Sequence, residues 1–372
     1  MVFKQCKKCL LPAAFTMSDI DSSGTCSYCR AQNNPEEKNT QLLNEVNRKK
    51  YEENLELTLK ECRRTNHYDA LVCLSGGKDS LYLLYLLKEK YKLNVLAFTT
   101  DANLPAIAWD NINITLAKLQ VDHLVFKPAE ATYKKLFRYI LKNQEARGAV
   151  YSVSYVYGPL FESDAMRAAS EKNIPLVFAA YSPGQPEKER MVYEFDRELI
   201  EKHDWTPPQL KNCKEFTAED LSRFWNPAVF PMRTNFPRYI APFHAWAYNQ
   251  DHVMKEVVKL GLVRRARFAS PILSNYPINW LLMYSDLKHF NYNPYAPEFS
   301  SLIREGKASR AYWKILGPII DAMIRRNIFL GKEVRKSLNW LELTPDELRI
   351  NLPKCAYDPV YIAERTEGGA IC

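Results

Sequence analysis

Residues 70–80 read ALVCLSGGKDS, and this stretch decides the class of fold. Its apolar part, residues 70–74, has the length and composition of a buried parallel strand. The strand runs into the pair Gly76-Gly77, and residues 79–91 then carry helical patterning. Paired glycines let the backbone turn sharply and bring its N–H groups close to an anion, and a following helix adds its positive N-terminal end. The stretch therefore predicts a phosphate-binding loop between a strand and a helix.

The side chains of this loop suit the same ligand. Lys78 adds a full positive charge, Ser75 and Ser80 offer hydroxyl groups to phosphate oxygens, and Asp79 could cap the helix or hold Mg²⁺. The spacing is shorter than that of a Walker loop. An ordinary strand–turn–helix connection is the alternative interpretation. The predicted nucleotide-binding residues are Ser75, Gly76, Gly77, Lys78, Asp79 and Ser80, and those predicted to act in catalysis are Lys78, Asp79 and Ser80.

Strands and helices alternate on the carboxyl side of the loop. Strands are expected at residues 94–100, 123–127 and 174–180, and helices at residues 107–119, 131–144 and 162–171. This alternation predicts an α/β fold, a doubly wound parallel sheet with right-handed crossovers. Ligands of such sheets lie beyond the carboxyl ends of the strands. Thr99, Thr100 and Asp101 end the second strand and are predicted to contact the nucleotide, the alternative being that they only cap the strand.

The remaining chain predicts a mainly helical region that covers one end of the sheet. Helices are expected at residues 217–226, 249–260, 298–305, 310–326 and 332–340. The predicted organisation is a four-cysteine module at 1–31, a linker helix at 32–67, a nucleotide-binding domain at 68–190 and a helical substrate-binding region at 191–372.

Four cysteines near the start form two knuckles. Cys6-x-x-Cys9 and Cys26-x-x-Cys29 are separated by sixteen residues, a spacing that lets both pairs close tetrahedrally on one ion. The sequence predicts structural Zn²⁺, and an iron–sulfur cluster is the main alternative because four thiolates suit either. A closed four-thiolate site has no open position for chemistry, so its role would be folding or docking.

Composition and charge narrow the class of protein. The 51 basic and 43 acidic residues give a formal net charge of +8, which favours anionic ligands. No apolar run reaches the length of a membrane span, and the first thirty residues are unlike a signal peptide. A cytoplasmic enzyme without a membrane partner is expected.

The string Ser75–Ser80 resembles the PP-loop of N-type ATP pyrophosphatases, which implies an adenine nucleotide alpha hydrolase-like fold. The resemblance implies that ATP is cleaved between its α and β phosphates, that a substrate oxygen becomes an adenylate, and that nitrogen or sulfur then displaces AMP. It implies that the loop embraces pyrophosphate and Mg²⁺. It also places Gly184, after the fourth strand, near the α-phosphate, although Ala179-Ala180 departs from the glycine-rich segment of relatives.

The cysteine knuckles followed by Tyr68-Asp69-x-Leu-Val-x-x-Ser-Gly-Gly-Lys-Asp-Ser resemble the N-acetyl sugar amidotransferases of surface polysaccharide biosynthesis. Segments 87–94, 110–112 and 303–310 are also similar to that family. The resemblance implies an amidotransferase acting on an N-acetyl or nucleotide sugar, with ammonia from a separate glutaminase and synthase pair. The chain has no room for its own glutaminase domain with a Cys–His pair.

Two other functions stay open. A PP-loop sulfurtransferase would form a thiocarbonyl on a tRNA base or small heterocycle, and Cys213 and Cys355 could then carry sulfur or a cluster, although packing is the commoner role of a lone cysteine. A nucleotide-binding scaffold without turnover is the third interpretation. Arg304 and Arg310 could clamp a diphosphate or carboxylate, or lie on a solvated helix face.

Overall fold

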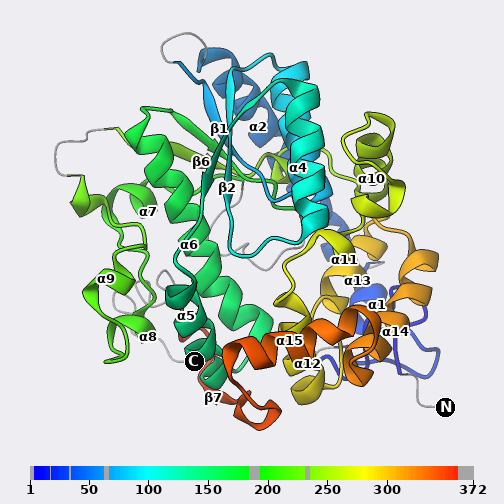
Figure 1. Ribbon diagram of the computed structural model, residues 1–372. Helices are drawn as coiled ribbons and strands as arrows, with labels where there is room; N and C mark the ends of the chain where they lie inside the picture. Colours follow the sequence, from blue (N-terminus) through cyan, green and yellow to red (C-terminus); the bar gives the residue numbers. More distant parts are fainter. Residues whose placement is uncertain are drawn as a thin grey trace.

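The computed structural model describes residues 4–16, 18–32, 35–62, 67–183, 193–230 and 235–358 (Figure 1). At its centre lies a five-stranded sheet in the order β3-β2-β1-β5-β6, in which every neighbouring pair is parallel. The strands are β1 (Ala70–Cys73), β2 (Val95–Thr100), β3 (Asp122–Phe126), β5 (Leu176–Phe178) and β6 (Arg238–Ile240). The predicted doubly wound parallel α/β fold is confirmed.

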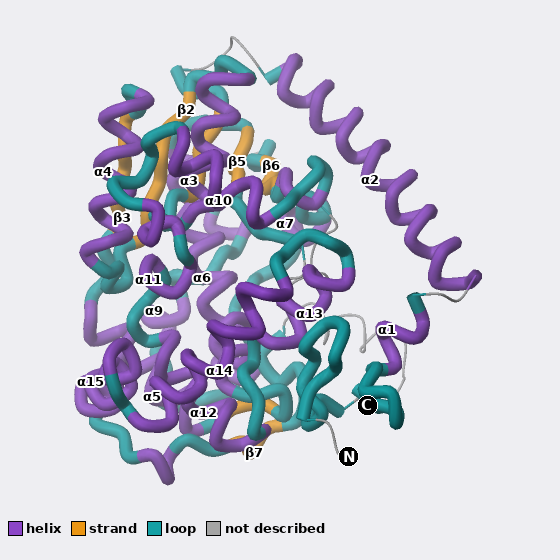
Figure 2. Tube along the Cα trace, turned by 90° about the vertical axis from the view of Figure 1, so that its right-hand side faces the viewer, coloured by secondary structure: helices purple, strands orange, loops and turns teal. Residues whose placement is uncertain are grey.

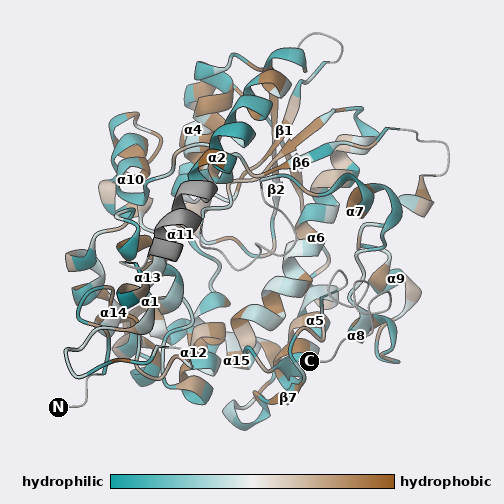
Figure 3. Cartoon of the chain, turned by 180° about the vertical axis from the view of Figure 1, so that it is seen from behind, coloured by the Kyte–Doolittle hydropathy of each residue, from teal (hydrophilic) through white to brown (hydrophobic). Residues whose placement is uncertain are grey.

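The central strands are apolar because both faces of the sheet are covered by helices. All six residues of β2 are buried, and Leu71 of β1 pairs in register with Leu96 on one side and Val177 on the other. The edge strand β3 is largely exposed, in keeping with its place. The central strands are coloured mainly as hydrophobic in the hydropathy view (Figure 3).

The strand order places the loop at the point where the chain changes direction across the sheet. From β1 the chain builds β2 and β3 on one side, and then crosses to β5 and β6 on the other. A crevice forms at such a switch point, beyond the carboxyl ends of the two diverging strands. Residues 74–77, which follow β1, therefore lie where a ligand is expected.

The helices surround the sheet and extend below it in the view of Figure 1. They are α1 (Ser27–Ala31), α2 (Pro35–Glu61), α3 (Lys78–Tyr85) with its π-helical extension η1 (Leu86–Lys90), α4 (Ala106–Leu119), α5 (Glu130–Lys142), α6 (Ala149–Glu171), α7 (Arg197–Lys202), α8 (Pro208–Lys211), α9 (Ala218–Leu221), α10 (Gln250–Lys259), α11 (Pro271–Ser274), α12 (Asn279–Phe290), α13 (Ala296–Arg304), α14 (Arg310–Arg326) and α15 (Lys332–Leu341). Short 3-10 turns lie at Pro227–Val229, Pro242–His244, Ala266–Ala269, Phe329–Gly331 and Pro345–Glu347.

Among the described residues there are three large apolar cores. Two pack against the sheet, and α6 contributes to one of them. The third joins α5 and α6 to α12, α14 and α15 and contains no strand of the five-stranded sheet. A small parallel pair, β4 (Gln144–Glu145) with β7 (Ile350–Leu352), closes the helical end. The helix α2 runs along the outside of the molecule (Figure 2), and Leu55 and Leu59 in its second half pack on the sheet core.

Several elements differ from the expectation. The helix α6 begins at Ala149 rather than at residue 162, although Pro159 lies inside it. A proline removes one helical hydrogen bond, but α6 is buried along nearly its whole length, so tertiary packing outweighs that loss. The helix expected at 217–226 is the single turn α9, α12 was not foreseen, and β6 adds a fifth strand from beyond residue 190.

Among the residues that the structure describes, no helix combines the length and apolar character needed to cross a bilayer.

Candidate nucleotide and substrate site

The loop after β1 has the backbone geometry that its glycines predict. Gly76 has a φ of +75°, and a Cβ atom there would lie 2.5 Å from the carbonyl oxygen of Ala108 in α4. Any side chain would therefore be strained by conformation and would clash with backbone. Gly77 is the N-cap of α3 and has an extended conformation. The loop thus approaches α4 closely and ends at the positive end of a helix.

The two serines of the loop bind each other across the turn. Ser80 Oγ lies 3.2 Å from Ser75 Oγ, accepts a hydrogen bond from the Ser75 N–H at 3.2 Å and donates to the carbonyl of Gly77 at 3.0 Å. These contacts hold the turn in a compact shape. They bring together all six residues of the predicted loop at the start of α3.

Lys78 and Asp79 form a buried ion pair at the end of the loop. Lys78 is 4% exposed, and its Nζ lies 2.5 Å from Asp79 Oδ2. The hydroxyl of Tyr248 donates to Asp79 Oδ1 at 2.9 Å and lies 3.4 Å from Lys78 Nζ. Burial and the Asp79 charge raise the pKa of Tyr248, so it stays a hydrogen-bond donor. Lys78, Asp79 and Tyr248 thus contact one another at the end of the loop, and the two charged groups are of the kinds that bind phosphate and a cation.

Asn111 on α4 supports the loop from behind. Its side-chain amide is fully buried and donates to the carbonyl of Gly76 at 3.0 Å and to that of Phe268 at 3.1 Å. A single amide group therefore joins the loop, α4 and the turn before α11. This contact fixes the direction in which the Gly76 carbonyl points.

The threonines that end β2 lie beside the loop and make local contacts. Thr99 donates to the carbonyl of Leu74 at 2.6 Å, and Thr100 donates to Asp164 at 3.2 Å. Asp101 accepts from the backbone of Leu104 at 3.1 Å. All three share the ligand edge of the sheet with the loop, and these bonds are those of strand-end caps.

The end of β5 also reaches the site. Ser182 is buried and shares the lining of one cavity with Lys78 and Asp79. Gly184, predicted near the α-phosphate, lies outside the described residues.

A cavity of about 340 Å³ opens next to the loop. Lys78, Asp79 and Ser182 line it on the side of the sheet, and α12, α13 and α14 supply most of the remaining wall. Its volume is in the range of small-molecule sites. The lining combines aromatic and amide side chains, which are Asn275, Asn279, Trp280, Asn291, Tyr292, Asn293, Tyr295, Phe299 and Trp313.

The cavity also contains a carboxyl group whose ionisation is disfavoured. Glu298, in the first turn of α13, is half-buried and lines the cavity together with Lys78 and Asp79. Burial raises the pKa of Glu298 to about 7, the Lys78 charge opposes the rise, and the Asp79 charge adds to it. A carboxyl group in this range can gain or lose a proton at neutral pH.

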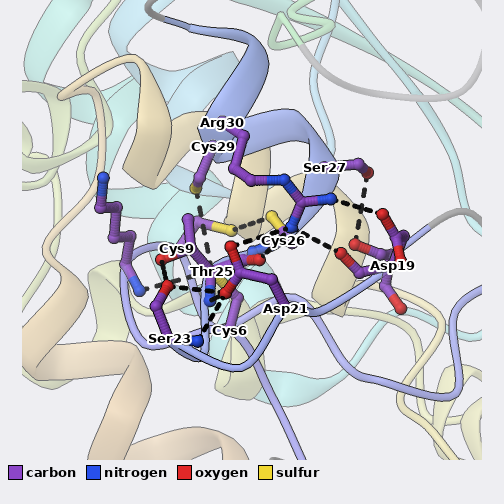
Figure 4. A network of polar contacts seen from close by, with 12 residues as sticks. Cys6, Cys9, Asp19, Asp21, Ser23, Thr25, Cys26, Ser27, Cys29 and Arg30 are labelled. Carbon is purple, nitrogen blue, oxygen red and sulfur yellow. Dashed lines mark hydrogen bonds and ion pairs between the residues drawn. The ribbon is translucent and has the colours of Figure 1, made fainter.

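The four predicted metal ligands come together at the other end of the chain. Figure 4 shows Cys6, Cys9, Cys26 and Cys29 converging, and their sulfur atoms all lie within 4.8 Å of one another. Cys6 and Cys29 are 3.8 Å apart, and Cys9 and Cys26 are 3.6 Å apart. Four sulfurs about 2.3 Å from one tetrahedral ion would be about 3.8 Å apart, so the cluster fits a single ion.

Backbone hydrogen bonds favour the thiolate form of one cysteine in the cluster, which is the form that binds a cation. Burial raises the pKa of the Cys6 thiol, but backbone N–H groups, including those of Lys8 and Cys26, outweigh it and bring the value to about 7. Burial raises the pKa of Cys26 to about 11. Four adjacent thiolates require a positive charge between them, which fits a resident metal. A side-chain network centred on Asp21 and Arg30 ties the second knuckle together (Figure 4).

Of the cysteines outside the knuckles, Cys213 and Cys355, the two predicted to carry sulfur or a cluster, do not line the cavity. Cys213 packs at the edge of the helical core, and Cys355 is buried where its N–H donates to Glu145 at 2.7 Å. Neither is among the described residues that surround Lys78 and Asp79. The structure therefore separates both thiols from the loop.

Arg304 and Arg310 contact the cysteine module. Arg304 donates to Cys9 Sγ at 3.4 Å and stacks its guanidinium on Tyr28, with 5.1 Å to the ring centroid. Arg310 donates to the carbonyl of Lys7 at 2.9 Å. The two arginines hold the module against α13 and α14, and neither lines the cavity as a clamp for a diphosphate.

Sequence reasoning missed Tyr248, Asn111 and Glu298 as parts of the site. Asn111 comes from α4, Glu298 from α13 and Tyr248 from the loop before α10, and none of them has a local motif around it. One signal was available, since Asn111 is a polar residue on the apolar, buried face of α4.

No protein-family model matches the sequence, and no curated protein matches it. Solved structures with some similarity include the U34-tRNA thiolase NcsA from Methanococcus maripaludis with its 4Fe–4S cluster, which is 16% identical with a TM-score of 0.36 over 95% of this chain and 91% of that chain. The NH3-dependent NAD synthetase from Campylobacter jejuni in complex with the nitrate ion is 16% identical with a TM-score of 0.33, covering 79% of this chain and 96% of that one. The NMN synthetase from Francisella tularensis is 12% identical with a TM-score of 0.32, covering 82% of this chain and 97% of that one. TM-scores this low carry no argument about function, so the assignment of the site rests on its own residues.

Proposed function

We propose that the chain is an ATP-dependent amidotransferase that activates a substrate oxygen by adenylation and replaces it with nitrogen derived from ammonia. The observation that carries the proposal is that Lys78 and Asp79 of the glycine loop form part of the wall of a cavity sized for a small molecule. A nucleotide on the loop would thus meet a second substrate inside one enclosed site.

The chemistry needs positioning and charge stabilisation more than acid–base groups. A substrate oxygen attacks the α-phosphorus of ATP, a P–O bond forms, and the bond to the bridging α–β oxygen breaks to release pyrophosphate. Ammonia then attacks the activated carbon, the C–O bond breaks, AMP leaves with that oxygen, and a proton is lost from nitrogen. Lys78, the loop N–H groups and the N-terminus of α3 stabilise the negative charge on the leaving pyrophosphate. Asp79 is the carboxylate available to hold Mg²⁺, whose charge would add to that stabilisation.

The lining of the cavity supports a sugar as the acceptor. The cavity lining includes the aromatic side chains of Trp280, Tyr292 and Phe299, and the apolar face of a sugar ring fits such an aromatic wall. Asn293 donates to Asp321 at 3.0 Å and Tyr295 donates to Asn279 at 2.6 Å, so polar groups around the cavity are held in fixed directions. An acceptor with both apolar faces and many hydroxyl groups, such as an N-acetyl or nucleotide sugar, suits this combination.

Nitrogen is favoured over sulfur by the position of the thiols. A sulfur-carrying cysteine must reach the adenylated carbon. Cys213 packs against the helical core, Cys355 is buried beside Glu145, and Cys73 lies within β1; none of the three lines the cavity. Ammonia is proposed to come from a separate glutaminase and synthase pair or from solution.

Zn²⁺ is the metal proposed for the four cysteines. In a cubane iron–sulfur cluster each cysteine binds a different iron atom, which spreads the sulfurs far apart. The 3.6 and 3.8 Å separations suit one ion with all four ligands.

The products of ATP turnover test the proposal. The purified protein is incubated with ATP and Mg²⁺, with ammonium or sulfide, and with a panel of N-acetyl sugars, nucleotide sugars and nucleobases or tRNA. AMP and pyrophosphate that require ammonium and a sugar are the expected products. A requirement for sulfide with a base or tRNA would establish the sulfurtransferase instead. ADP would exclude the PP-loop assignment, and no turnover under any condition would favour a scaffold.

A further inference from the structure

The substrate cavity is built from parts of the chain that lie far apart in sequence. Lys4, Gln5, Leu10 and Pro12, which belong to the first cysteine knuckle and its flanks, line the same cavity as Lys78 of the loop. The first knuckle therefore forms part of the wall of this cavity.

The cysteine module is fastened to the helices that form the rest of the cavity. Besides the contacts of Arg304 and Arg310, Gln32 donates to the carbonyl of Arg304 at 3.0 Å. Phe15 meets Tyr292, which itself lines the cavity, in an edge-to-face contact with ring centroids 5.9 Å apart. These contacts set the position of the knuckle relative to α13 and α14.

The sulfur cluster fixes the shape of the knuckle itself. Gln5 precedes the ligand Cys6 and pairs with Pro12 in an antiparallel bridge, and the N–H of Cys6 donates to the carbonyl of Leu11 at 2.8 Å. The buried core of the module consists of the four cysteines and Leu11, so the cysteines make up most of its interior. A metal held by the cysteines would keep Lys4 and Gln5 at the cavity.

We infer that the first knuckle is the specificity-determining wall of the acceptor site, with Lys4 and Gln5 contacting the acceptor and the metal holding them in place. The inference rests on the proposed function for the identity of the acceptor as a sugar. The ammonium group of Lys4 favours an acceptor with an anionic substituent, and the Gln5 amide can donate to or accept from its hydroxyl or phosphate oxygens. The class of ligand is a sugar that carries phosphate, as a sugar phosphate or a nucleotide sugar.

The first experiment measures binding without catalysis. Isothermal titration compares N-acetylglucosamine, its 1-phosphate and UDP-N-acetylglucosamine on the wild-type protein, Lys4→Ala, Gln5→Ala and the matched control Lys8→Ala, an exposed lysine of the same knuckle. Wild type is expected to bind the phosphorylated sugars about tenfold more tightly than the neutral one, and Lys4→Ala to lose that preference. Gln5→Ala is expected to weaken all three, whereas Lys8→Ala changes none. Equal affinities of wild type and Lys4→Ala, or no binding to wild type, would overturn the assignment. Comparison of the two phosphorylated sugars separates a phosphate contact from a contact with the nucleotide.

The second experiment tests the role of the metal through the protein backbone. Hydrogen–deuterium exchange is followed by mass spectrometry before and after removal of the metal with a chelator, with metal content measured on the same samples. Faster exchange is expected in residues 4–16 and in α13, with no change in the peptide that spans β1 and the start of α3. Unchanged exchange in α13 would show that the metal does not maintain the wall. Because neither experiment needs turnover, binding without AMP formation would refute the proposed function and leave this inference standing.

Discussion

At the scale of single residues, the site depends on a lysine that is almost completely buried. Lys78 is 4% exposed, and its charge is balanced by Asp79 at 2.5 Å. A buried lysine without such a partner would be strongly destabilising. The ion pair therefore stabilises the buried ammonium group of Lys78, next to the predicted phosphate site, in the absence of nucleotide. Phosphate oxygens and Mg²⁺ are expected to replace the two partners when ATP binds.

Replacement of the lysine tests its assignment. Lys78→Met keeps the length of the side chain and removes the charge, and it is expected to lower the rate of AMP formation by about 10²–10³-fold, the usual cost of losing one preorganised charged contact to a leaving group. Steady-state kinetics with the acceptor found in the panel of substrates measure the effect. Lys60→Met, an exposed residue of α2, is the matched control. A kcat within a few-fold of wild type for Lys78→Met would exclude the loop from catalysis.

The carboxyl group of Glu298 predicts a dependence of stability on pH. Burial raises its pKa from 4.5 to about 7, so the folded protein keeps a proton that the unfolded chain loses. The free energy of unfolding should therefore fall as pH rises from about 5 to about 7 and stay low above that range. Glu298→Gln should abolish the contribution of this carboxyl group to the decrease in the free energy of unfolding. That contribution is about 1–2 kcal/mol after allowance for solvent near a half-buried group.

Denaturant unfolding of wild type and Glu298→Gln at pH 5 and pH 8, without nucleotide, measures that difference. The free energy of unfolding of the variant, relative to that of wild type, is expected to be higher at pH 8 than at pH 5. Glu219→Gln, at an exposed position of α9, provides the control for loss of a surface charge. A difference that shrinks with rising pH would contradict the assignment of a raised pKa.

At the scale of elements, the long helix α6 begins at a buried carboxylate from another helix. Asp286 of α12 is fully buried and accepts hydrogen bonds from the N–H groups of Ala149 at 2.5 Å and Val150 at 3.1 Å. Gly148 precedes them with a φ of +98°, and a Cβ atom there would lie 2.4 Å from Asp286 Oδ1. A glycine and a distant carboxylate thus form the helix start that no local capping residue provides.

Removal of that carboxylate should destabilise the protein. Asp286→Ala leaves two buried N–H groups without their acceptor and is expected to reduce the free energy of unfolding by about 2–3 kcal/mol. Asp286→Asn keeps one acceptor oxygen and should lose about half as much. Urea unfolding followed by circular dichroism compares both with Asp346→Ala, whose side chain is 96% exposed and which should change little. Equal stabilities of the alanine variant and wild type would show that α6 does not need this cap.

At the scale of the whole molecule, the separation of the helical end from the sheet keeps Cys213 and Cys355 away from the loop. Cys213 and Cys355 belong to the helical end, while the loop belongs to the sheet. The double variant Cys213→Ala/Cys355→Ala should therefore keep ammonium-dependent AMP formation within about twofold of wild type, apart from any loss of stability at the buried Cys355. Activity is measured below the unfolding temperature of the variant. A folded double variant that no longer forms AMP would favour the sulfurtransferase over the amidotransferase.

The elements that could be predicted are those with a local signal. The loop at 75–80 and the strand before it stand out because a buried parallel strand and a glycine turn both depend on adjacent residues. The helix expected at 310–326 agrees with α14, since its apolar positions repeat along its own length. The strand β6 has only three residues, too few for any pattern, and it forms because an edge of the sheet is free to accept it.

The sequence by itself determined the parallel α/β class, the phosphate loop and the set of four cysteines, because each depends on residue types at fixed short spacings. Only the tertiary structure decided what meets at the site. Tyr248 and Glu298 reach Lys78 and Asp79, and Lys4 and Gln5 reach the same cavity, across long separations in the chain. Such contacts arise from the packing of helices against one end of the sheet, and short-range sequence patterns carry no record of which distant side chains that packing brings together.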